Sequence, residues 1–422
     1  MNNKFKCIYV VDHPRRDMHA YIWWASLLAK DNFKNFVIST SSISIKKINQ
    51  IKPNAIIWSY ARPQNAFLIQ YSYLKGIKNI IHDTEGITYR CDKEYSDSCD
   101  NLTLKCIHGI WGWGEEQKKL INNRCAKIGH KLVASNIGSI RYEYYKNLKI
   151  SRKKNNKILI NTNFPIIDPR YGSLESDYKI WVNIEKKLSK IEFIKRCIEL
   201  SAMRQSLINF VKELIDKNLF KPKDIILRTH PFESDNYYRD LKGLGVEISN
   251  KNDIAYDISR SFLMAQCGCQ TVLDGLIQDV PSILIKPSFE NIWSDLSSQI
   301  DTDYLQKLNE DKNEYYSFKK RNIKSAKKIV TPFLSNIEKQ INYELLISNL
   351  FEPLKKNKIL FFYTYFFNLL IRISKNLKDY LRFLLYPRKI LNKKLTNEIL
   401  IKYMLKKKIP YSIDSNNNIY LD

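Results

Sequence analysis

The chain has 422 residues, 44% of them hydrophobic and 12% aromatic, which is enough for two packed domains and an appended segment. Lys and Arg number 69 against 43 Asp and Glu, so the formal net charge is +26. This composition excludes a disordered chain, and it favours anionic surroundings such as phosphorylated substrates, nucleic acid or lipid headgroups.

Signals for export, membrane spanning and metal binding are weak throughout the sequence. The apolar stretch at 7–11 is too short for a signal peptide, and no uninterrupted run of about 18 apolar residues occurs. We therefore expect the eight cysteines to be reduced thiols in the cytoplasm. They include no CxxC pair of the kind found in zinc sites, so no metal is expected.

Residues 1–150 alternate between strand-like and helix-like segments. Helical periodicity occurs at 17–31 and 66–76. Short apolar runs typical of buried strands occupy 7–11, 36–40, 55–61, 79–83 and 109–114. Alternation at this spacing predicts a parallel sheet covered on both faces.

A polar, basic stretch at 147–157 predicts a linker, after which a second α/β series follows. Helices are expected at 180–217 and 270–278, and strands at 158–164, 224–231, 246–250 and 281–287. The predicted fold is therefore α/β, with two Rossmann-like domains, 1–150 and 151–350, facing each other across a cleft. Ligands of such sheets bind beyond the carboxyl ends of the strands.

The remaining residues, 351–422, differ from both domains. From Lys355 onward they include 15 Lys and Arg but 4 Asp and Glu, and Ile359–Ile371 is dense in aromatic side chains. A helix of that length covers roughly 20 Å, short of the roughly 30 Å needed to span a bilayer. We expect a basic, partly helical tail lying on an anionic membrane surface. Packing of the apolar run on the N-terminal domain is the alternative.

Two carboxylates lie at the end of the predicted strand at 79–83, in the sequence Asp83-Thr84-Glu85-Gly86. Asp83 and Glu85 could supply a general base, or a nucleophile with an electrostatic partner. An acidic cap at a turn is the alternative.

We place Arg16, Gly86 and Arg141 at the substrate. Arg16 stands at a predicted helix start, where a cation is unfavourable, so it could reach an anionic ligand, and a side chain that points into solvent is the alternative. Gly86 belongs to the turn of the two carboxylates, and Arg141 to a loop whose small residues would allow a ligand close to the backbone.

The predicted strand at 224–231 ends in Arg228-Thr229-His230-Pro231. Arg228 and His230 could bind a nucleotide phosphate by charge-assisted hydrogen bonds, while Pro231 fixes the turn. The alternative for His230 is simple capping of a loop.

Other polar residues follow strands of the second domain or open its helix near 270. The N–H groups at that helix start could bind an anion, although ordinary capping by Thr271 is the alternative. The predicted nucleotide-binding set is Asn161, Asn163, Arg228, His230, Glu233, Cys269, Gln270 and Thr271.

Seven stretches, in chain order, resemble those of bacterial surface-carbohydrate biosynthesis proteins. They are "RRDMHAYIWWASLLA", "DTEG", "WGWGEEQ", "GSIRYE", "ILINTNF", "RTHPFE" and the block from "CGCQT" to "VPSILI". That family consists of GT-B-type glycosyltransferases related to the β-Kdo transferases of lipopolysaccharide and capsule. The resemblance covers most of residues 1–300. It implies that Asp83 and Glu85 form the catalytic carboxylate motif, that His230 binds the nucleotide phosphate, and that Cys269–Thr271 makes a second phosphate contact.

Together these features predict a metal-independent glycosyltransferase without a cofactor, located in the cytoplasm and peripheral on the inner face of the cell membrane. Its expected partners are a nucleotide sugar, first a CMP-activated ulosonic acid such as CMP-Kdo, and a lipid-linked or oligosaccharide acceptor. The alternatives are a CDP-polyol-dependent glycerol or ribitol phosphotransferase of the teichoic-acid type and a non-catalytic glycan-assembly scaffold. Nucleic acid is not an expected partner, because no RNP-like or KH-like signature occurs.

Overall fold

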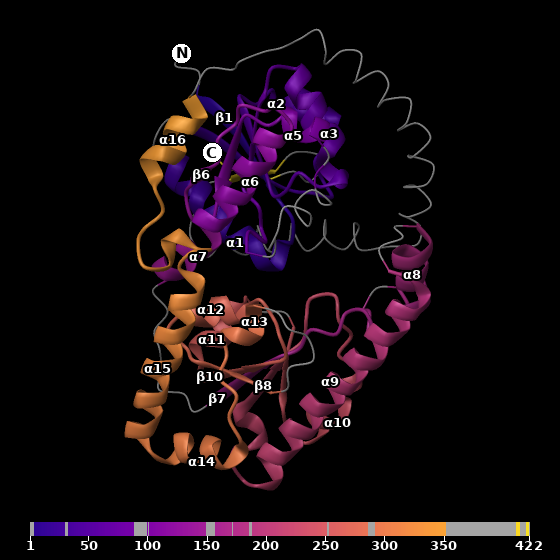
Figure 1. The fold of residues 1–422 in the computed structure, drawn as a ribbon, viewed down its shortest axis with the longest axis vertical. Coiled ribbons are helices and arrows are strands. Elements are labelled where there is room, and N and C mark those ends of the chain that lie inside the picture. The colour runs from indigo at the N-terminus through magenta and orange to yellow at the C-terminus, as the bar shows by residue number, and fades with distance from the viewer. Residues whose placement is uncertain are drawn as a thin grey trace. The chain divides into compact units, whose positions relative to one another are not determined.

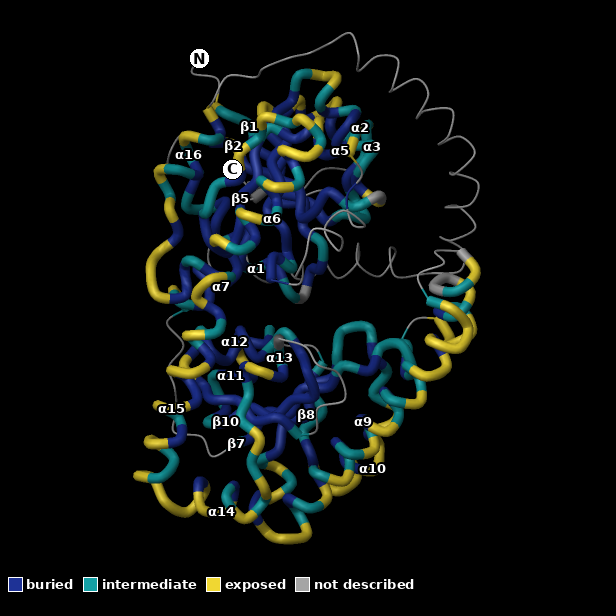
Figure 2. The backbone as a smooth tube through the Cα atoms, in the orientation of Figure 1, coloured by how far each residue is buried: buried dark blue, intermediate teal, exposed yellow. Residues whose placement is uncertain are grey.

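The computed structural model describes residues 4–29, 33–87, 99, 101–148, 157–170, 172–184, 188–250, 253–285, 292–351, 411–413 and 419–421. The chain divides into two compact units. Of the described residues, unit 1 contains those up to 144 and, after the chain returns to it, those from 330 onward. Unit 2 contains residues 145–329. Both are α/β units whose central strands are buried, as Figure 2 shows in dark blue.

Unit 1 is built on a six-stranded parallel sheet with the order β2-β1-β3-β4-β5-β6. Figure 1 labels its strands β1 and β6 among the helices that connect the sheet. Its strands are β1 (Phe5–Val11), β2 (Phe33–Ser39), β3 (Ala55–Trp58), β4 (Lys78–Ile81), β5 (Gly109–Gly112) and β6 (Ser135–Asn136). The central strands are continuous apolar runs, as expected of parallel strands that are covered on both faces. The strand order reverses between β1 and β3, which places the ligand-binding edge at their carboxyl ends.

Helices connect these strands. They are α1 (Pro14–Leu28), α2 (Ile45–Ile51), α3 (Pro63–Leu74), α5 (Asn101–Lys105), α6 (Glu115–Lys127) and α7 (Ile140–Asn147). Proline occupies the first turn of α1 and α3, where its missing N–H costs no hydrogen bond. For this reason α1 begins at Pro14, three residues before the predicted start.

The chain returns to unit 1 after α15 (Lys312–Val330), through the 3₁₀ turn η5 (Ser335–Ile337) and α16 (Tyr343–Phe351). α16 buries Leu346 and Leu350, and the buried Lys78 amine caps its last turn by donating to the Asn349 carbonyl at 2.6 Å. Residues 330–350, which the sequence placed in the second domain, thus lie in unit 1.

Unit 2 is built on a five-stranded parallel sheet with the order β11-β10-β7-β8-β9. Its strands are β7 (Lys157–Asn161), β8 (Ile225–Arg228), β9 (Glu247–Ser249), β10 (Ser261–Gln266) and β11 (Ser282–Leu284). Its helices are α8 (Leu174–Tyr178), η2 (Lys179–Ile184), α9 (Lys190–Asp216), η3 (Pro222–Asp224), η4 (Asn236–Tyr238), α10 (Arg239–Gly243), α11 (Ile254–Ser259), α12 (Thr271–Ile277), α13 (Ile292–Asp295), α14 (Thr302–Glu310) and α15. The order reverses between β7 and β10, so their carboxyl ends mark the expected ligand edge.

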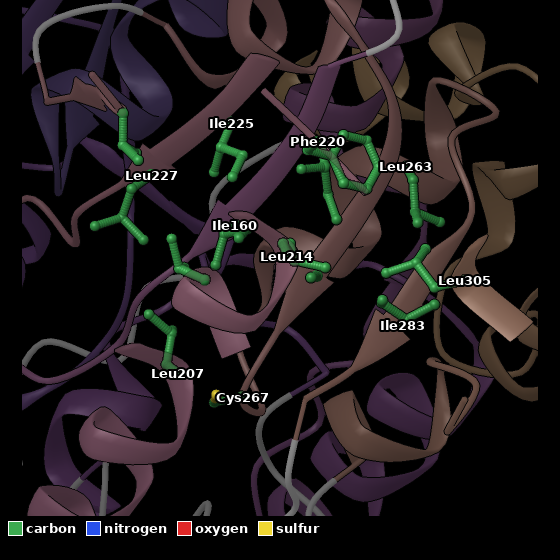
Figure 3. Close-up of a cluster of buried hydrophobic side chains, with 14 of the residues drawn as sticks. Ile160, Leu207, Leu214, Phe220, Ile225, Leu227, Leu263, Cys267, Ile283 and Leu305 are labelled. Carbon is green, nitrogen blue, oxygen red and sulfur yellow. The ribbon is translucent and has the colours of Figure 1, made fainter. Parts of the chain in front are cut away.

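The core of unit 2 forms where α9 packs on the sheet. Leu207 and Leu214 of α9 are fully buried with Ile160 and Leu227 of the strands (Figure 3). A capping box at Ser189 fixes the start of α9. This packing holds the β7 and β8 strand ends in place.

Both Rossmann-like sheets predicted from the sequence are confirmed, while the cleft between the two domains stays a prediction. In the part of the chain that the structure describes, no helix is both long and apolar enough to cross a bilayer. The predicted tail lies almost entirely outside the described residues. Its described parts are β12 (Tyr411–Ile413) and β13 (Ile419–Leu421), which pair antiparallel.

Candidate functional site

The carboxyl edge of the unit 1 sheet gathers charged residues from three strand ends. Asp12 follows β1, Tyr60 and Arg62 follow β3, and Asp83 and Glu85 follow β4. Because β1, β3 and β4 are adjacent and parallel, these residues lie at one edge, beside the reversal of strand order. We call this group, together with Arg16 and Asp17 of α1, the Asp83 cluster.

Arg16 is the hub of the Asp83 cluster. Its guanidinium pairs with Asp12 at 3.0 Å, with Asp17 at 3.0 Å and with Glu85 at 3.1 Å. Arg62 pairs with the other Glu85 oxygen at 2.7 Å. A cation at a helix start is unfavourable, but the three carboxylates paired with Arg16 offset this effect. The Arg16 side chain is 25% exposed, so it does not point into bulk solvent.

Asp83 and Glu85 have opposite electrostatics although they are two residues apart. Burial raises the pKa of Asp83 to about 6, against the opposing effects of the Arg62 guanidinium and of the Glu85 N–H, which donates to Asp83 Oδ1 at 2.9 Å. Burial also acts to raise the pKa of Glu85, but the guanidiniums of Arg16 and Arg62 outweigh it and lower that pKa to about 2. Asp83 can thus exchange a proton near neutral pH, whereas Glu85 stays ionised and holds two cations.

The turn that carries both carboxylates is fixed by its surroundings. The Thr84 N–H donates to the Ser59 carbonyl at 3.0 Å. A side chain at Gly86 would place its Cβ 2.5 Å from Trp113, so only glycine fits there. The structure gives Gly86 a packing reason to be glycine, and its predicted substrate contact stays a prediction.

His82 and Arg141 are buried residues next to the Asp83 cluster. His82 Nδ1 lies 3.0 Å from the Trp111 carbonyl, and its Nε2 accepts from the Ile140 N–H at 3.2 Å. Burial lowers the pKa of His82 to about 4, so the ring is neutral and joins β4 to β5 and α7. The Arg141 guanidinium lies 3.5 Å from the Asp17 carboxylate of the cluster, and the residue is only 4% exposed. Its predicted substrate contact stays a prediction.

The carboxyl edge of the unit 2 sheet ends in a row of polar residues. Gln266 of β10, Asn161 of β7, Arg228 of β8 and Ser249 of β9 are in register, so their side chains point to the same face. Asn161 is buried, and among the described residues neither its side-chain nitrogen Nδ2 nor its oxygen Oδ1 has a hydrogen-bond partner. An amide left open at the reversal of strand order can accept and donate hydrogen bonds to a ligand or water.

Arg228 forms a buried ion pair with Asp257. Its guanidinium lies 2.6 Å from Asp257 of α11, which is fully buried and also accepts from the Ser249 hydroxyl at 2.6 Å. The predicted phosphate contact of Arg228 stays a prediction, and this pair gives the side chain a second role in holding α11 to the sheet.

His230 is half-buried in the loop that follows β8, two residues after Arg228, and its predicted phosphate contact stays a prediction. Its main-chain N–H donates to the Thr162 hydroxyl at 3.2 Å, and its ring Nδ1 accepts from the Phe232 N–H at 3.2 Å. The neutral ring therefore carries its proton on Nε2. Glu233, three residues on, is fully buried, and burial raises its pKa to about 7.

The other predicted nucleotide contacts lie on neighbouring loops of unit 2. The Cys269 N–H donates to the Gln266 side chain, Gln270 precedes α12, and Thr271 begins it. The predicted anion contact at the N-terminus of α12, a helix of seven residues, stays a prediction. Asn163 is half-buried in the turn after β7.

Several members of both sites escaped prediction from the sequence. They are Asp12, Asp17, Tyr60, Arg62, Thr162, Tyr238 and Asp257. Asp12 and Arg62 directly follow the predicted strands at 7–11 and 55–61, so the strand-end rule that selected Asp83 and His230 would have found them. In the described ranges, no group of three His, Cys, Asp or Glu side chains could hold a metal ion.

No protein-family model and no curated protein matches the chain. Among solved structures, a proposed UDP-N-acetylglucosamine 2-epimerase from Listeria monocytogenes is similar with a TM-score of 0.50 at 10% identity, over 84% of this chain and 99% of that one. A UDP-GlcNAc 2-epimerase from Neisseria meningitidis, bound to UDP-GlcNAc, gives 0.47 at 12% identity over 82% and 99%. A wall teichoic acid polymerase gives 0.46 at 10% identity over 83% and 89%. The first of these similarities shows the fold: the chain has the two Rossmann-like units of the GT-B type.

Proposed function

We propose that the protein is a nucleotide-sugar-dependent glycosyltransferase of bacterial surface polysaccharide biosynthesis. Unit 1 would carry the general base and unit 2 would hold the donor nucleotide. The observation that supports this most is that two carboxyl groups of different character lie in one turn. Asp83 is buried and has a pKa of about 6, whereas Glu85 is ion-paired with two arginines. Two carboxyl groups with separated pKa values at a strand edge are typical of acid–base sites.

In the proposed reaction, Asp83 accepts the proton of an acceptor hydroxyl while the hydroxyl oxygen attacks the anomeric carbon of the donor. The bond between that carbon and the phosphate oxygen breaks, and the phosphate leaves with the electron pair. Glu85 keeps Arg16 and Arg62 in place, which preorganises positive charge beside the base. This assignment predicts inversion at the anomeric centre. A product that retains the configuration would make Asp83 a nucleophile instead.

On the donor side, His230 would donate a hydrogen bond from Nε2 to the leaving phosphate, because its Nδ1 is already an acceptor. The open Asn161 amide would serve the nucleotide or a water that bridges to it. This arrangement needs no metal for the leaving group, so activity in excess EDTA should equal that in buffer. The first donor to test, a CMP-activated ulosonic acid such as CMP-Kdo, rests on the sequence resemblance.

The acceptor and the location belong to the same proposal. A lipid-linked or oligosaccharide acceptor would be met at the inner face of the cell membrane, where the 351–422 tail would bind anionic headgroups. The charge of that tail, 15 Lys and Arg against 4 Asp and Glu from Lys355 onward, supports this.

Nucleotide binding tests the proposal without an acceptor. Thermal shift with CMP, CDP, UDP and GDP should select one nucleotide, because a ligand at 100 times its Kd stabilises by about 2.7 kcal/mol. His230→Ala should reduce the shift to about half, as expected for a Kd that is about tenfold weaker, whereas His130→Ala, which removes a histidine from unit 1, should keep the full shift. The donor that is then consumed separates the alternatives: a CMP-sugar supports this proposal, a CDP-polyol supports phosphotransfer, and binding without turnover supports a scaffold.

A further inference from the structure

Glu233 is an unusual carboxylate, because it is fully buried and its hydrogen bonds come from neutral groups. The Thr162 hydroxyl donates to it at 2.7 Å, the Phe164 N–H at 2.8 Å and the Tyr238 hydroxyl at 2.6 Å. Among the described residues, no Lys or Arg side chain forms an ion pair with it. A buried carboxylate of this kind is costly, so its contacts must serve a specific geometry.

The contacts of Glu233 join three segments: the turn after β7, the loop after β8 and η4. The Thr162 hydroxyl is shared, since it donates to Glu233 and also accepts from the His230 N–H at 3.2 Å. A hydroxyl has one hydrogen to donate. Because Glu233 takes that hydrogen, the Thr162 lone pairs face His230, and the main chain of His230 is held to the β7 turn.

The ring of His230 depends on the same loop. Its Nδ1 accepts from the Phe232 N–H, one residue before Glu233. The Arg170 side chain further fixes this loop by donating to the Glu233 carbonyl at 2.8 Å. A shift of the loop would therefore move the Phe232 N–H and change which ring nitrogen carries the proton.

We infer that Glu233 is a positioning residue that aims the His230 imidazole through Thr162 and the 230–233 loop, and that it does not itself contact nucleotide. The phosphate-binding role of His230 in this inference rests on the proposed function above. Glu233 has no exposed surface, so a ligand cannot reach its side chain. In this inference, the positioning role takes the place of the nucleotide contact that the sequence predicted for Glu233.

The chemistry of the three contacts predicts which substitutions are tolerated. Glutamine can accept from Thr162 and Phe164 through its carbonyl and donate to the Tyr238 hydroxyl through its amide. Glu233→Gln should therefore keep the loop. Glu233→Ala removes all three contacts and frees the Thr162 hydroxyl to turn. Glu247→Gln is the matched control, because Glu247 is a partly buried carboxylate of the same unit, paired with Arg260.

The first readout is the ¹⁵N shifts of the His230 ring, measured without nucleotide in histidine-labelled protein and assigned with His230→Ala. Glu233→Gln and Glu247→Gln should show the wild-type tautomer, while Glu233→Ala should lose it. Unchanged ring shifts in Glu233→Ala would overturn the inference. Should that variant fail to fold, Thr162→Val removes the shared hydroxyl at nearly the same size and should change the ring in the same way.

The second readout is the Kd of the nucleotide selected by thermal shift. Glu233→Ala should weaken binding about tenfold, the loss of one well-placed hydrogen bond, and Glu233→Gln by less than about threefold. In a His230→Ala background, Glu233→Ala should weaken it no further. An equal loss in both backgrounds would show a general structural role. If wild type binds none of the nucleotides, the proposed function fails, and the ring shifts alone decide the role of Glu233.

Discussion

Asp83 and Glu85 should respond to neutralisation with opposite changes in stability, although they are neighbours in one turn. Burial raises the pKa of Asp83, so its charged form destabilises the folded protein. Two guanidiniums lower the pKa of Glu85 against the effect of burial, so its charged form stabilises the fold. Asp83→Asn should therefore increase the free energy of unfolding at pH 8, and Glu85→Gln should decrease it.

The magnitudes follow from the pKa values. A tenfold change in acidity corresponds to about 1.4 kcal/mol. The pKa of Asp83 moves from 3.8 to about 6, so Asp83→Asn should gain up to about 3 kcal/mol above pH 6. This gain shrinks as the pH falls and disappears below about pH 4. The pKa of Glu85 falls from 4.5 to about 2. Because this side chain is 27% exposed, screening reduces the loss in Glu85→Gln to about 1–2 kcal/mol, present above pH 4.5 and absent near pH 2.

Urea unfolding followed by tryptophan fluorescence measures the stability changes of both variants in unit 1, which contains Asp83 and Glu85. Five of the seven tryptophans lie in residues 4–144, so the signal reports on unit 1 rather than on a single transition of the whole chain. The asparagine keeps an oxygen that accepts from the Glu85 N–H, which isolates the charge effect. Loss of stability in Asp83→Asn at pH 8, or changes of the same sign in both variants, would refute this account of the cluster.

The remaining predictions concern activity and location. If Asp83 is the base, kcat/KM should rise tenfold per pH unit below about pH 6 and level off above it, and a flat profile from pH 5 to 8 would remove Asp83 from that role. Excess EDTA should leave the rate unchanged, and a loss restored by a divalent ion would contradict metal independence. Replacing Arg372, Lys375 and Lys378 by Glu should weaken binding to anionic vesicles by at least about a hundredfold, since each cation contributes about 1 kcal/mol. Equal binding of this variant and wild type would place the membrane contact elsewhere.

The parallel sheets could be predicted because their strands are continuous apolar runs. The runs at 7–11, 55–61, 79–83 and 158–164 overlap β1, β3, β4 and β7, where burial on both faces demands such residues. The return of 330–350 to unit 1 could not be predicted, since an amphipathic helix does not specify which sheet covers it. α16 is placed by long-range contacts, such as that of Lys78 with the Asn349 carbonyl.

The candidate sites were predictable only in part. Asp83 and His230 were found because each lies at the carboxyl end of a predicted strand, whereas the role of Arg62 depends on Glu85, which is distant in sequence. Glu233 shows the converse difficulty. A carboxylate after a His-Pro turn suggests a ligand contact, and only the fold reveals that Thr162 and its neighbours bury it.

The central claim, that this chain transfers a sugar from a nucleotide with Asp83 as base, is tested most directly by a transfer assay. Purified wild type and Asp83→Asn are each incubated with a panel of nucleotide sugars, including CMP-Kdo, and membrane-extracted acceptors, and released nucleotide is measured. Wild type should consume one donor and glycosylate an acceptor. Asp83→Asn should bind that donor with unchanged Kd but turn over at least about a hundredfold more slowly. Consumption of no donor by wild type, or full turnover by Asp83→Asn, would contradict the claim.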